Sequence, residues 1–207
     1  MPTMPALIRI PSVLLLSLAC GQALAAVPAK APARPAVTEE LALEPVLAGE
    51  FALQAGKLAE AARWYLQAAQ QTDGDAGLAE RATRIAMLAN EDDAAAKGLA
   101  LWQQRAPRSL AMRSAAGALA MRQGDVKTAR SELQALLQDP GDEGWKFALG
   151  ALIGGGRDPA VPAQVLGELV DANAIPQKIE AWQEFGRLAL RMEKPELARR
   201  MIDEVVK

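Results

Sequence analysis

Histidine is absent from the 207-residue chain, and cysteine occurs only once, at Cys20. Without histidine the chain lacks the usual general base, the partner of Ser-His and Cys-His nucleophile pairs, and the commonest zinc ligand. A single cysteine leaves no partner for a disulfide within the chain. We therefore expect a protein that is not an enzyme and that needs neither a cofactor nor a metal ion.

Aromatic residues are scarce as well, at 4% of the chain, and neither sign of charge dominates. The 23 Lys and Arg residues nearly balance the 25 Asp and Glu residues, which gives a net charge of -2. A nucleic-acid-binding protein normally has a basic excess on one face, so nucleic acid is not an expected partner. The abundant Ala and Leu residues favour helices that pack closely through small side chains, and nothing indicates a sheet.

The first 25 residues have the features of a secretory signal peptide. Arg9 precedes an apolar run over residues 13–19, which is shorter than the roughly 20 residues that span a bilayer. Two processing routes fit: an A-x-A site predicts cleavage after Ala25, whereas residues 17–20 resemble a bacterial lipobox, which implies a lipid on Cys20. Both routes predict an exported, periplasmic protein, and the second would make it a lipoprotein, for instance of the outer membrane.

Residues 26–41 form a Pro/Ala-rich linker ahead of the repeat domain, which we place at residues 42–207. Three prolines between residues 26 and 37 argue against a helix there, because proline lacks an amide hydrogen and restricts the residue before it. Pro45 predicts in addition that the first regular helix begins only near Leu43 or Glu44.

The domain repeats itself with a period of 34 residues. This step aligns three sets of residues: Gly56 with Asn90 and Gly124, Ala61 with Ala95 and Ala129, and Tyr65 with Leu99 and Leu133. Gly49 finds no glycine at Thr83 but matches Gly117 after a second step. Apolar residues recur at helical spacing within the units. A period of this length with small residues at matched positions is typical of a solenoid of helix pairs.

These repeats resemble the tetratricopeptide repeat (TPR) family, in which small residues let the two helices of each pair approach closely. The resemblance implies an all-α fold, an α-solenoid of about five TPR-like helix pairs over most of the chain. The first three units are residues 42–75, 76–109 and 110–143. The fourth, residues 144–177, is degenerate because three glycines at residues 154–156 interrupt it, and a second helix is expected over residues 160–172. The last unit resumes one residue out of step.

Glycine inside a helix destabilises it by about 0.5–1 kcal/mol relative to alanine, so its return at matched positions indicates a packing requirement. We interpret Gly49 and Gly56 in this way, as points of close helix approach. The run of glycines at residues 154–156 lacks the spacing of a phosphate-binding loop and is expected to be a flexible turn.

The TPR resemblance also implies a concave groove, lined by the first helix of each unit, that binds a segment of another protein. Positions that face this groove in the family correspond to the following residues: Glu50, Leu53, Glu80, Arg84, Met87, Ser114, Met121, Arg122, Gln183, Arg187 and Leu190. They would form an apolar strip with both signs of charge at its rim. Met87 and Met121 fit packing between helices equally well, because Met often fills gaps in a core.

The expected function is a scaffold or adaptor for protein–protein interaction in the bacterial cell envelope. The Ala-rich start of the domain is similar to envelope TPR proteins, some of which are lipoproteins that bring substrates to carboxyl-terminal processing proteases. The alternative is a structural assembly factor that stabilises an envelope machine. Ile202 and Val205 continue the apolar pattern at the end of the chain, so either a partner covers them or the chain is the N-terminal part of a longer TPR array.

Overall fold

The computed structural model describes the backbone of residues 36–206 and the side chains of residues 43–204. The predicted signal peptide, Cys20 and most of the predicted linker lie outside the described residues. The described part contains ten helices and no strand. They are α1 (Ala36–Gln54), α2 (Leu58–Gln71), α3 (Ala76–Leu88), α4 (Asp92–Arg105), α5 (Leu110–Arg122), α6 (Val126–Leu137), α7 (Gly144–Gly154), α8 (Ala160–Asp171), α9 (Ile179–Arg191) and α10 (Pro195–Val206). Among these helices, none combines the length and the apolar character needed to cross a membrane.

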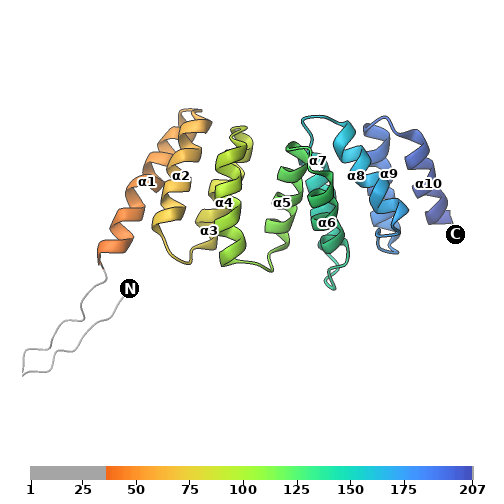
Figure 1. The fold of residues 1–207 in the computed structure, drawn as a ribbon, viewed down its shortest axis with the longest axis horizontal. Coiled ribbons are helices and arrows are strands. Elements are labelled where there is room, and N and C mark those ends of the chain that lie inside the picture. Colours follow the sequence, from red (N-terminus) through yellow and green to blue (C-terminus); the bar gives the residue numbers. More distant parts are fainter. Residues whose placement is uncertain (1–35, 207) are drawn as a thin grey trace, which may run out of the picture. The chain divides into compact units, whose positions relative to one another are not determined.

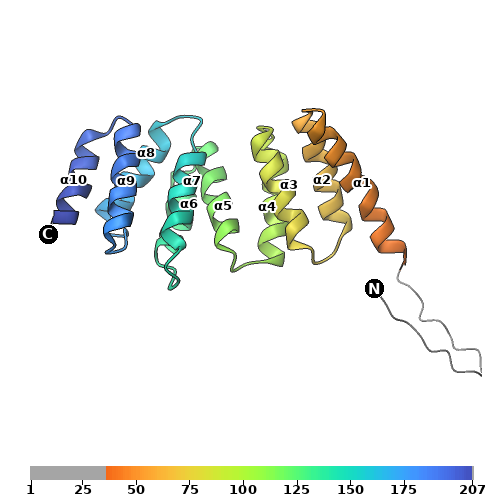
Figure 2. The ribbon, with the colours of Figure 1, turned by 180° about the vertical axis from the view of Figure 1, so that it is seen from behind.

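The helices of residues 36–206 follow one another in a single row, as Figure 1 and the reverse view in Figure 2 show. Consecutive helices pack in pairs, α1 with α2, α3 with α4, α5 with α6, and α9 with α10. The first helix of each pair also contacts the first helix of the next: α3 packs against α5, α5 against α7, and α7 against α9. The predicted α-solenoid of TPR-like helix pairs is therefore confirmed.

The first helix starts earlier than the sequence predicted. α1 begins at Ala36, and Pro45 lies inside it with a buried side chain. The expectation that helix begins only near Leu43 was wrong, because proline removes one amide hydrogen bond from a helix but does not prevent it when packing supports the backbone.

Glycines set the distance between the helices of a pair. A Cβ atom at Gly49 would lie 2.8 Å from two ring carbons of Tyr65, whose side chain is fully buried in α2. Two repeats later, a Cβ atom at Gly117 of α5 would overlap Cδ1 of Leu133 in α6. The predicted packing role of Gly49 and Gly117 therefore has a direct structural basis.

The second pair places its glycine on the other helix. A Cβ atom at Gly98 of α4 would lie 2.8 Å from Oγ1 and 3.1 Å from the backbone nitrogen of Thr83 in α3. The buried Thr83 hydroxyl donates to the carbonyl of Ala79, at 2.7 Å. The two helices therefore approach closely although position 83 carries a side chain. Gly98 of α4 takes the place of the glycine that is missing at position 83 of α3.

Gly56 and Gly124 have a different role from the one predicted. Their φ angles are +71° and +74°, and the aligned Asn90 has a φ of +60°. Each follows the end of a first helix, where the amide of Gly56 donates to the Leu53 carbonyl, and the next amide donates to the carbonyl five residues before it. No atom lies within 4 Å of a Cβ built on Gly56 or Gly124. The packing interpretation of Gly56 was therefore wrong: the left-handed backbone, which glycine adopts without strain, is what recurs.

The fourth unit is irregular and tightly packed. A Cβ atom at the buried Gly155 would overlap the methyl of Met121 and lie 3.1 Å from Cα of Ala118, both in α5. At the other end of α7, a Cβ atom at Gly144 would overlap the carbonyl oxygen of Leu136 in α6. Gly155 lies in the predicted turn between α7 and α8, where it is buried and lets the end of α7 lie directly on α5.

The core consists of two clusters of buried side chains, and Met87 packs against both. Tyr65 and Trp102 are the largest buried side chains of the first cluster, and Phe185 is among the largest of the second. At the far end of the row Ile202 is 54% exposed on α10. The side chain of Val205 lies outside the described residues.

Replacing Gly49 by alanine tests the glycine contact. We expect Gly49→Ala to lower the free energy of unfolding by about 1–3 kcal/mol, because the rigid Tyr65 ring must shift to admit the new methyl group. Gly186→Ala is the matched control at the corresponding position of α9, where a Cβ atom would lie 3.7 Å from Cβ of Met201, an ordinary contact. The control should gain about 0.5–1 kcal/mol from helix propensity. Chemical unfolding measures both, and equal gains would contradict the proposed contact.

Candidate protein-binding pocket

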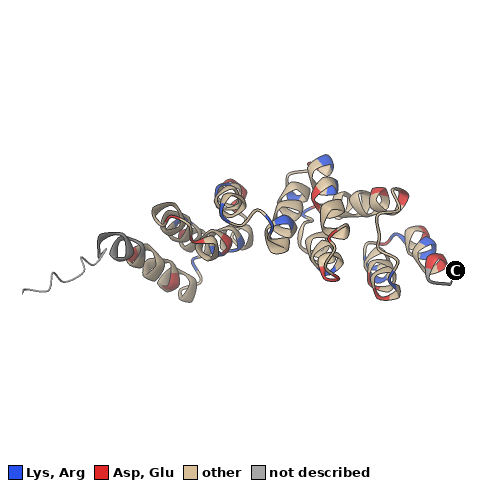
Figure 3. Cartoon of the chain, turned by 90° about the horizontal axis from the view of Figure 1, so that it is seen from below, with Lys and Arg blue, Asp and Glu red and all other residues tan. Residues whose placement is uncertain are grey.

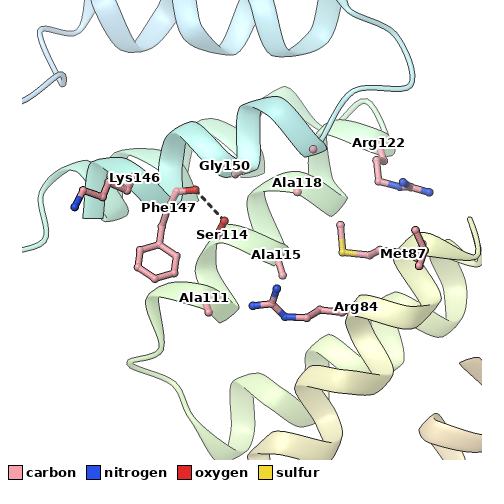
Figure 4. Close-up of a pocket in the computed structure, with 13 residues that line it drawn as sticks. Arg84, Met87, Ala111, Ser114, Ala115, Ala118, Arg122, Lys146, Phe147 and Gly150 are labelled. Carbon is pink, nitrogen blue, oxygen red and sulfur yellow. Dashed lines mark hydrogen bonds between the residues drawn. The ribbon is translucent and has the colours of Figure 1, made fainter. Parts of the chain in front are cut away.

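A surface pocket lies where the first helices of units two, three and four meet. Its volume is about 570 Å³, and α3, α5 and α7 line it. The lining residues are Arg84, Met87, Leu88, Ala111, Ser114, Ala115, Ala118, Arg122, Lys146, Phe147, Gly150, Ala151 and Gly154. Figure 4 shows the side chains of the three helices around the pocket. Four of the sequence-predicted groove residues belong to it: Arg84, Met87, Ser114 and Arg122.

The pocket exists because the residues of α5 and α7 that face it are small. Ala111, Ala115 and Ala118 line it from α5, and Gly150 and Gly154 from α7. A Cβ atom built on Gly150 or Gly154 would meet no atom within 4 Å, and neither glycine has a positive φ angle. Packing inside the chain therefore does not require glycine at either position, although glycine inside a helix costs about 0.5–1 kcal/mol relative to alanine.

Two larger apolar side chains are available at the pocket. Leu88 ends α3 with 65% of its surface exposed, which is unusual for a large aliphatic residue beside a hollow. Phe147 of α7 is half-buried and packs against the core. Met87 contributes to the lining of the pocket and also packs against both core clusters, so it lies at the surface position and at the packing position that the sequence offered.

A hydrogen bond fixes the position of α7 against α5. The hydroxyl of Ser114 donates to the backbone carbonyl of Phe147 at 2.9 Å, as the dashed line in Figure 4 marks. Ser114 was predicted to face a partner, but its hydroxyl already holds two helices of the pocket together. Ser114 therefore shapes the pocket.

Two cations at the pocket are exposed and only weakly held. Arg84 reaches from α3 toward Ala111 and Ala115 of α5 in Figure 4, with its side chain 60% exposed and Nε donating to Glu80 at 2.8 Å. Lys146 is 54% exposed and pairs with Glu143, at 2.8 Å. Exposed pairs three or four residues apart on a helix stabilise it by only about 0.3–0.5 kcal/mol. Arg84 also lies over the Trp102 ring, 5.9 Å from its centroid, and Lys146 lies 5.8 Å from the centroid of Trp145. Exposed contacts of this kind contribute only about 0.5–1 kcal/mol, so both cations can turn toward another carboxylate at a modest cost.

Arg122 is the exception among the pocket cations, because it belongs to a network inside the chain. Its side chain is 10% exposed and pairs with Asp92 at 2.8 Å. It also donates to the side-chain oxygen of Asn90 at 2.9 Å, and Arg157 pairs with the second oxygen of Asp92 at 3.2 Å. The network joins the turn between α3 and α4 to α5 and to the segment after α7, so Arg122 is a structural residue.

Glu50 is likewise engaged within the chain. Its carboxylate accepts hydrogen bonds from the Tyr65 hydroxyl and from Arg81, which joins the first two units. Burial and the hydrogen bond to Glu50 raise the pKa of Tyr65 to about 12, although the nearby Arg81 guanidinium acts in the opposite direction. Leu53 of the same unit is half-buried and packs against the core. Neither residue lies at the pocket.

The remaining predicted groove residues fall outside the pocket. Gln183, Arg187 and Leu190 are exposed on α9, and Arg187 pairs with Glu184. Met121 is only 2% exposed and packs beside Gly155, so its predicted place on the groove surface is corrected to the core.

Sequence reasoning missed the contribution of α7, because the three glycines made the fourth unit look degenerate. Lys146, Phe147, Gly150 and Gly154 all come from this helix. The available signal was the pair of glycines four residues apart in an otherwise apolar helix, which places both on one face.

Charge is spread along the row of helices without a cluster of one sign, as Figure 3 shows. In the part of the chain whose side chains are described, no three Asp, Glu or Cys side chains come together where they could hold a metal ion. The features that distinguish the pocket are its shape, its apolar lining and its exposed cations.

Comparison with known proteins gives a fold likeness only. No family model matches the chain, and no curated protein sequence matches it. A crystal structure of MamA is similar at 13% identity and a TM-score of 0.48, covering 81% of this chain and 91% of that chain. A structure of MamA from residue 41 onward, from Desulfovibrio magneticus RS-1, is similar at 17% identity and a TM-score of 0.47, covering 81% and 94%. These values are low, so we draw nothing about function from them.

The raised pKa of Tyr65 predicts a loss of stability in alkali. The unfolded chain loses the tyrosine proton near pH 10, whereas the folded chain keeps it to about pH 12, so the free energy of unfolding should fall between these values, by up to about 3 kcal/mol. Below pH 10 this contribution is fully present. Tyr65 is the only tyrosine, so tyrosinate absorbance reports it alone. Tyr65→Phe should remove this part of the pH dependence, and half-ionisation of the folded chain at pH 10 would contradict it.

The two arginines of the pocket should differ in their effect on stability. Arg122→Ala is expected to lower the free energy of unfolding by about 1–3 kcal/mol, because it leaves half-buried groups of the Asp92 network unpaired. Arg84→Ala should lower it by no more than about 1 kcal/mol, because it removes only an exposed ion pair and a cation–π contact with Trp102. Urea unfolding of the two variants provides the measurement, and equal losses would rule out a structural role specific to Arg122.

Proposed function

We propose that this protein is a non-enzymatic interaction scaffold of the bacterial cell envelope, which holds a segment of another protein in the pocket of α3, α5 and α7. The observation that carries the proposal is the hollow over Gly150 and Gly154, where a Cβ atom would meet nothing within 4 Å. At Gly150, in the interior of α7, the chain keeps glycine at a cost in stability and gains no contact of its own from it.

The lining of the pocket favours an apolar side chain of a protein over a small polar ligand. A small-molecule site usually has several polar groups that are fixed in place around an apolar cavity. Here Ser114 and Arg122 are engaged within the chain, and only Arg84 and Lys146 remain, as exposed cations on long side chains. Grooves built from helices commonly take apolar anchor residues from an amphipathic segment.

The proposed location in the envelope rests on residues 1–25 and their resemblance to a signal peptide. The finer proposal is an adaptor that brings a client to an envelope protease. Both the location and the client are proposed from the sequence alone.

A structural assembly factor is the second candidate, and a separate surface favours it. Leu43, Leu47 and Phe51 are 55%, 47% and 67% exposed on α1. Their spacing of four residues places them on one face of the helix. An exposed apolar stripe of this kind is typical of a surface that packs against another protein.

Photo-crosslinking in cells that make the protein tests the two candidates. A photoreactive residue at Leu88 reports the pocket, one at Leu47 reports the α1 stripe, and one at the exposed Gln103 of α4 serves as a control. For an adaptor, we expect adducts in the envelope fraction from position 88 that disappear when Gly150→Leu fills the pocket. Gly167→Leu is the matched control, since a Cβ atom at this helical position of α8 also meets nothing within 4 Å.

Each outcome decides between the candidates. Adducts from position 47 that contain stoichiometric subunits and that persist in Gly150→Leu would favour the assembly factor. The same adducts from positions 88 and 103, or adducts in the cytosolic fraction alone, would count against the scaffold proposed here. Thermal unfolding of both leucine variants checks that they are folded.

A further inference from the structure

We infer that the segment bound in the pocket is acidic and amphipathic, with one large apolar side chain entering the hollow over Gly150 and Gly154 and a neighbouring carboxylate pairing with Arg84. The inference rests on the proposed function and names the chemistry of the partner. It joins three observations. The charges that line the pocket are all positive, the ion pairs of Arg84 and Lys146 are exposed and weak, and the small residues of α5 and α7 form a hollow floor to the pocket.

Every charged residue that lines the pocket is a cation, although the chain as a whole carries a net charge of -2. The three are Arg84, Arg122 and Lys146, one from each helix. The carboxylates that pair with them, on Glu80, Asp92 and Glu143, do not belong to the lining. A segment that enters the pocket therefore meets positive charge and no carboxylate among the lining residues, which favours an acidic partner.

Arg84 is the cation best placed to receive a carboxylate. Its side chain is 60% exposed and extends from α3 across the side of α5 that carries Ala111 and Ala115 (Figure 4). Its pair with Glu80 lies within one helix and is open to solvent, so a new carboxylate can replace it. The guanidinium also lies 5.9 Å from the centroid of the Trp102 ring, a weak contact that does not occupy its hydrogen-bond donors. Arg122 is less suited to this role, because its side chain is only 10% exposed and its Nε and Nη2 atoms are bound to Asp92 and Asn90.

The floor of the pocket provides the second element of recognition. The methyl groups of Ala115 and Ala118 and the bare backbone at Gly150 and Gly154 leave a hollow of about 570 Å³, with the exposed Leu88 and the half-buried Phe147 among its lining residues. Apolar surface that is open to water in this way is stabilised when an aliphatic or aromatic side chain covers it. The absence of Cβ atoms on α7 also lets the backbone of the bound segment approach closely.

Other occupants fit the pocket less well. The chain's own segment at residues 26–37 carries Lys30 and Arg34 and no acidic residue, so its charge has the same sign as the lining. The phosphates of a nucleic acid would find cations but could not cover the apolar floor. An acidic segment with an apolar anchor satisfies both parts of the site.

Selection from a displayed library of random 16-residue peptides, with the full chain as bait and Gly150→Leu for counterselection, tests the inference. We expect the selected peptides to be acidic and to carry an Asp or Glu within one helical turn of a large apolar residue. Replacing that apolar residue by alanine should weaken binding about 10- to 100-fold, because its burial is lost.

A charge exchange tests the role of Arg84 directly. Arg84→Glu should weaken the best acidic peptide by about tenfold or more, and exchanging the acidic residue of the peptide for lysine should restore binding to this variant. Lys97→Glu is the matched control: it makes the same change in charge at an exposed residue of α4 outside the pocket, and it should leave the affinity unchanged.

The outcomes separate this inference from the proposed function. Neutral or basic peptides that Gly150→Leu excludes would overturn the acidic partner and leave binding in the pocket intact. Acidic peptides whose affinity is the same for the wild type, Arg84→Glu and Lys97→Glu would overturn the pairing with Arg84. A library in which no peptide distinguishes the wild type from Gly150→Leu would refute both the inference and the proposed pocket function.

Discussion

The close approach of paired helices at glycine is the contact on which the solenoid depends. Gly49 lets α1 lie against the Tyr65 ring, Gly117 lets α5 lie against Leu133, and Gly98 gives α4 the same access to Thr83. Close packing at these points buries alanines on both helices of a pair, so a chain with few aromatic residues still forms a dense core. The glycine moves between helices in the second unit, which shows that the distance between the helices is preserved rather than the position of the glycine.

The same kind of contact produces the pocket. Gly144 and Gly155 hold the two ends of α7 against α6 and α5, and the Ser114 hydrogen bond fixes the helix between them. The interruption of the repeat in the fourth unit therefore does more than lengthen a turn. It brings the open face of Gly150 and Gly154 next to the small residues of α5, so the irregular unit supplies one wall of the candidate site.

The cations of the chain divide into those that hold the fold and those that are available to a partner. Arg81 and Arg122 join neighbouring units through Glu50 and Asp92. Arg84 and Lys146 each form an ion pair with a carboxylate of their own helix region, lie over the rings of Trp102 and Trp145, and remain exposed. Under the proposed function, recognition of a partner falls to a small set of side chains on a packed helical frame, which limits the entropy lost on binding.

The sequence by itself determined the helical class, the 34-residue period and the main points of helix approach, because helical periodicity and small residues at crossings are local and repeated features. It could not distinguish Gly49, a packing contact, from Gly56, a left-handed helix end, since both recur at matched positions. It also assigned Met121, Glu50 and Arg122 to a binding surface, whereas Met121 is buried in the core and the other two are held by ion pairs between units. Only the tertiary structure decided which exposed side chains face a common hollow, because that depends on how α7 lies against α5, a contact between residues far apart in the chain.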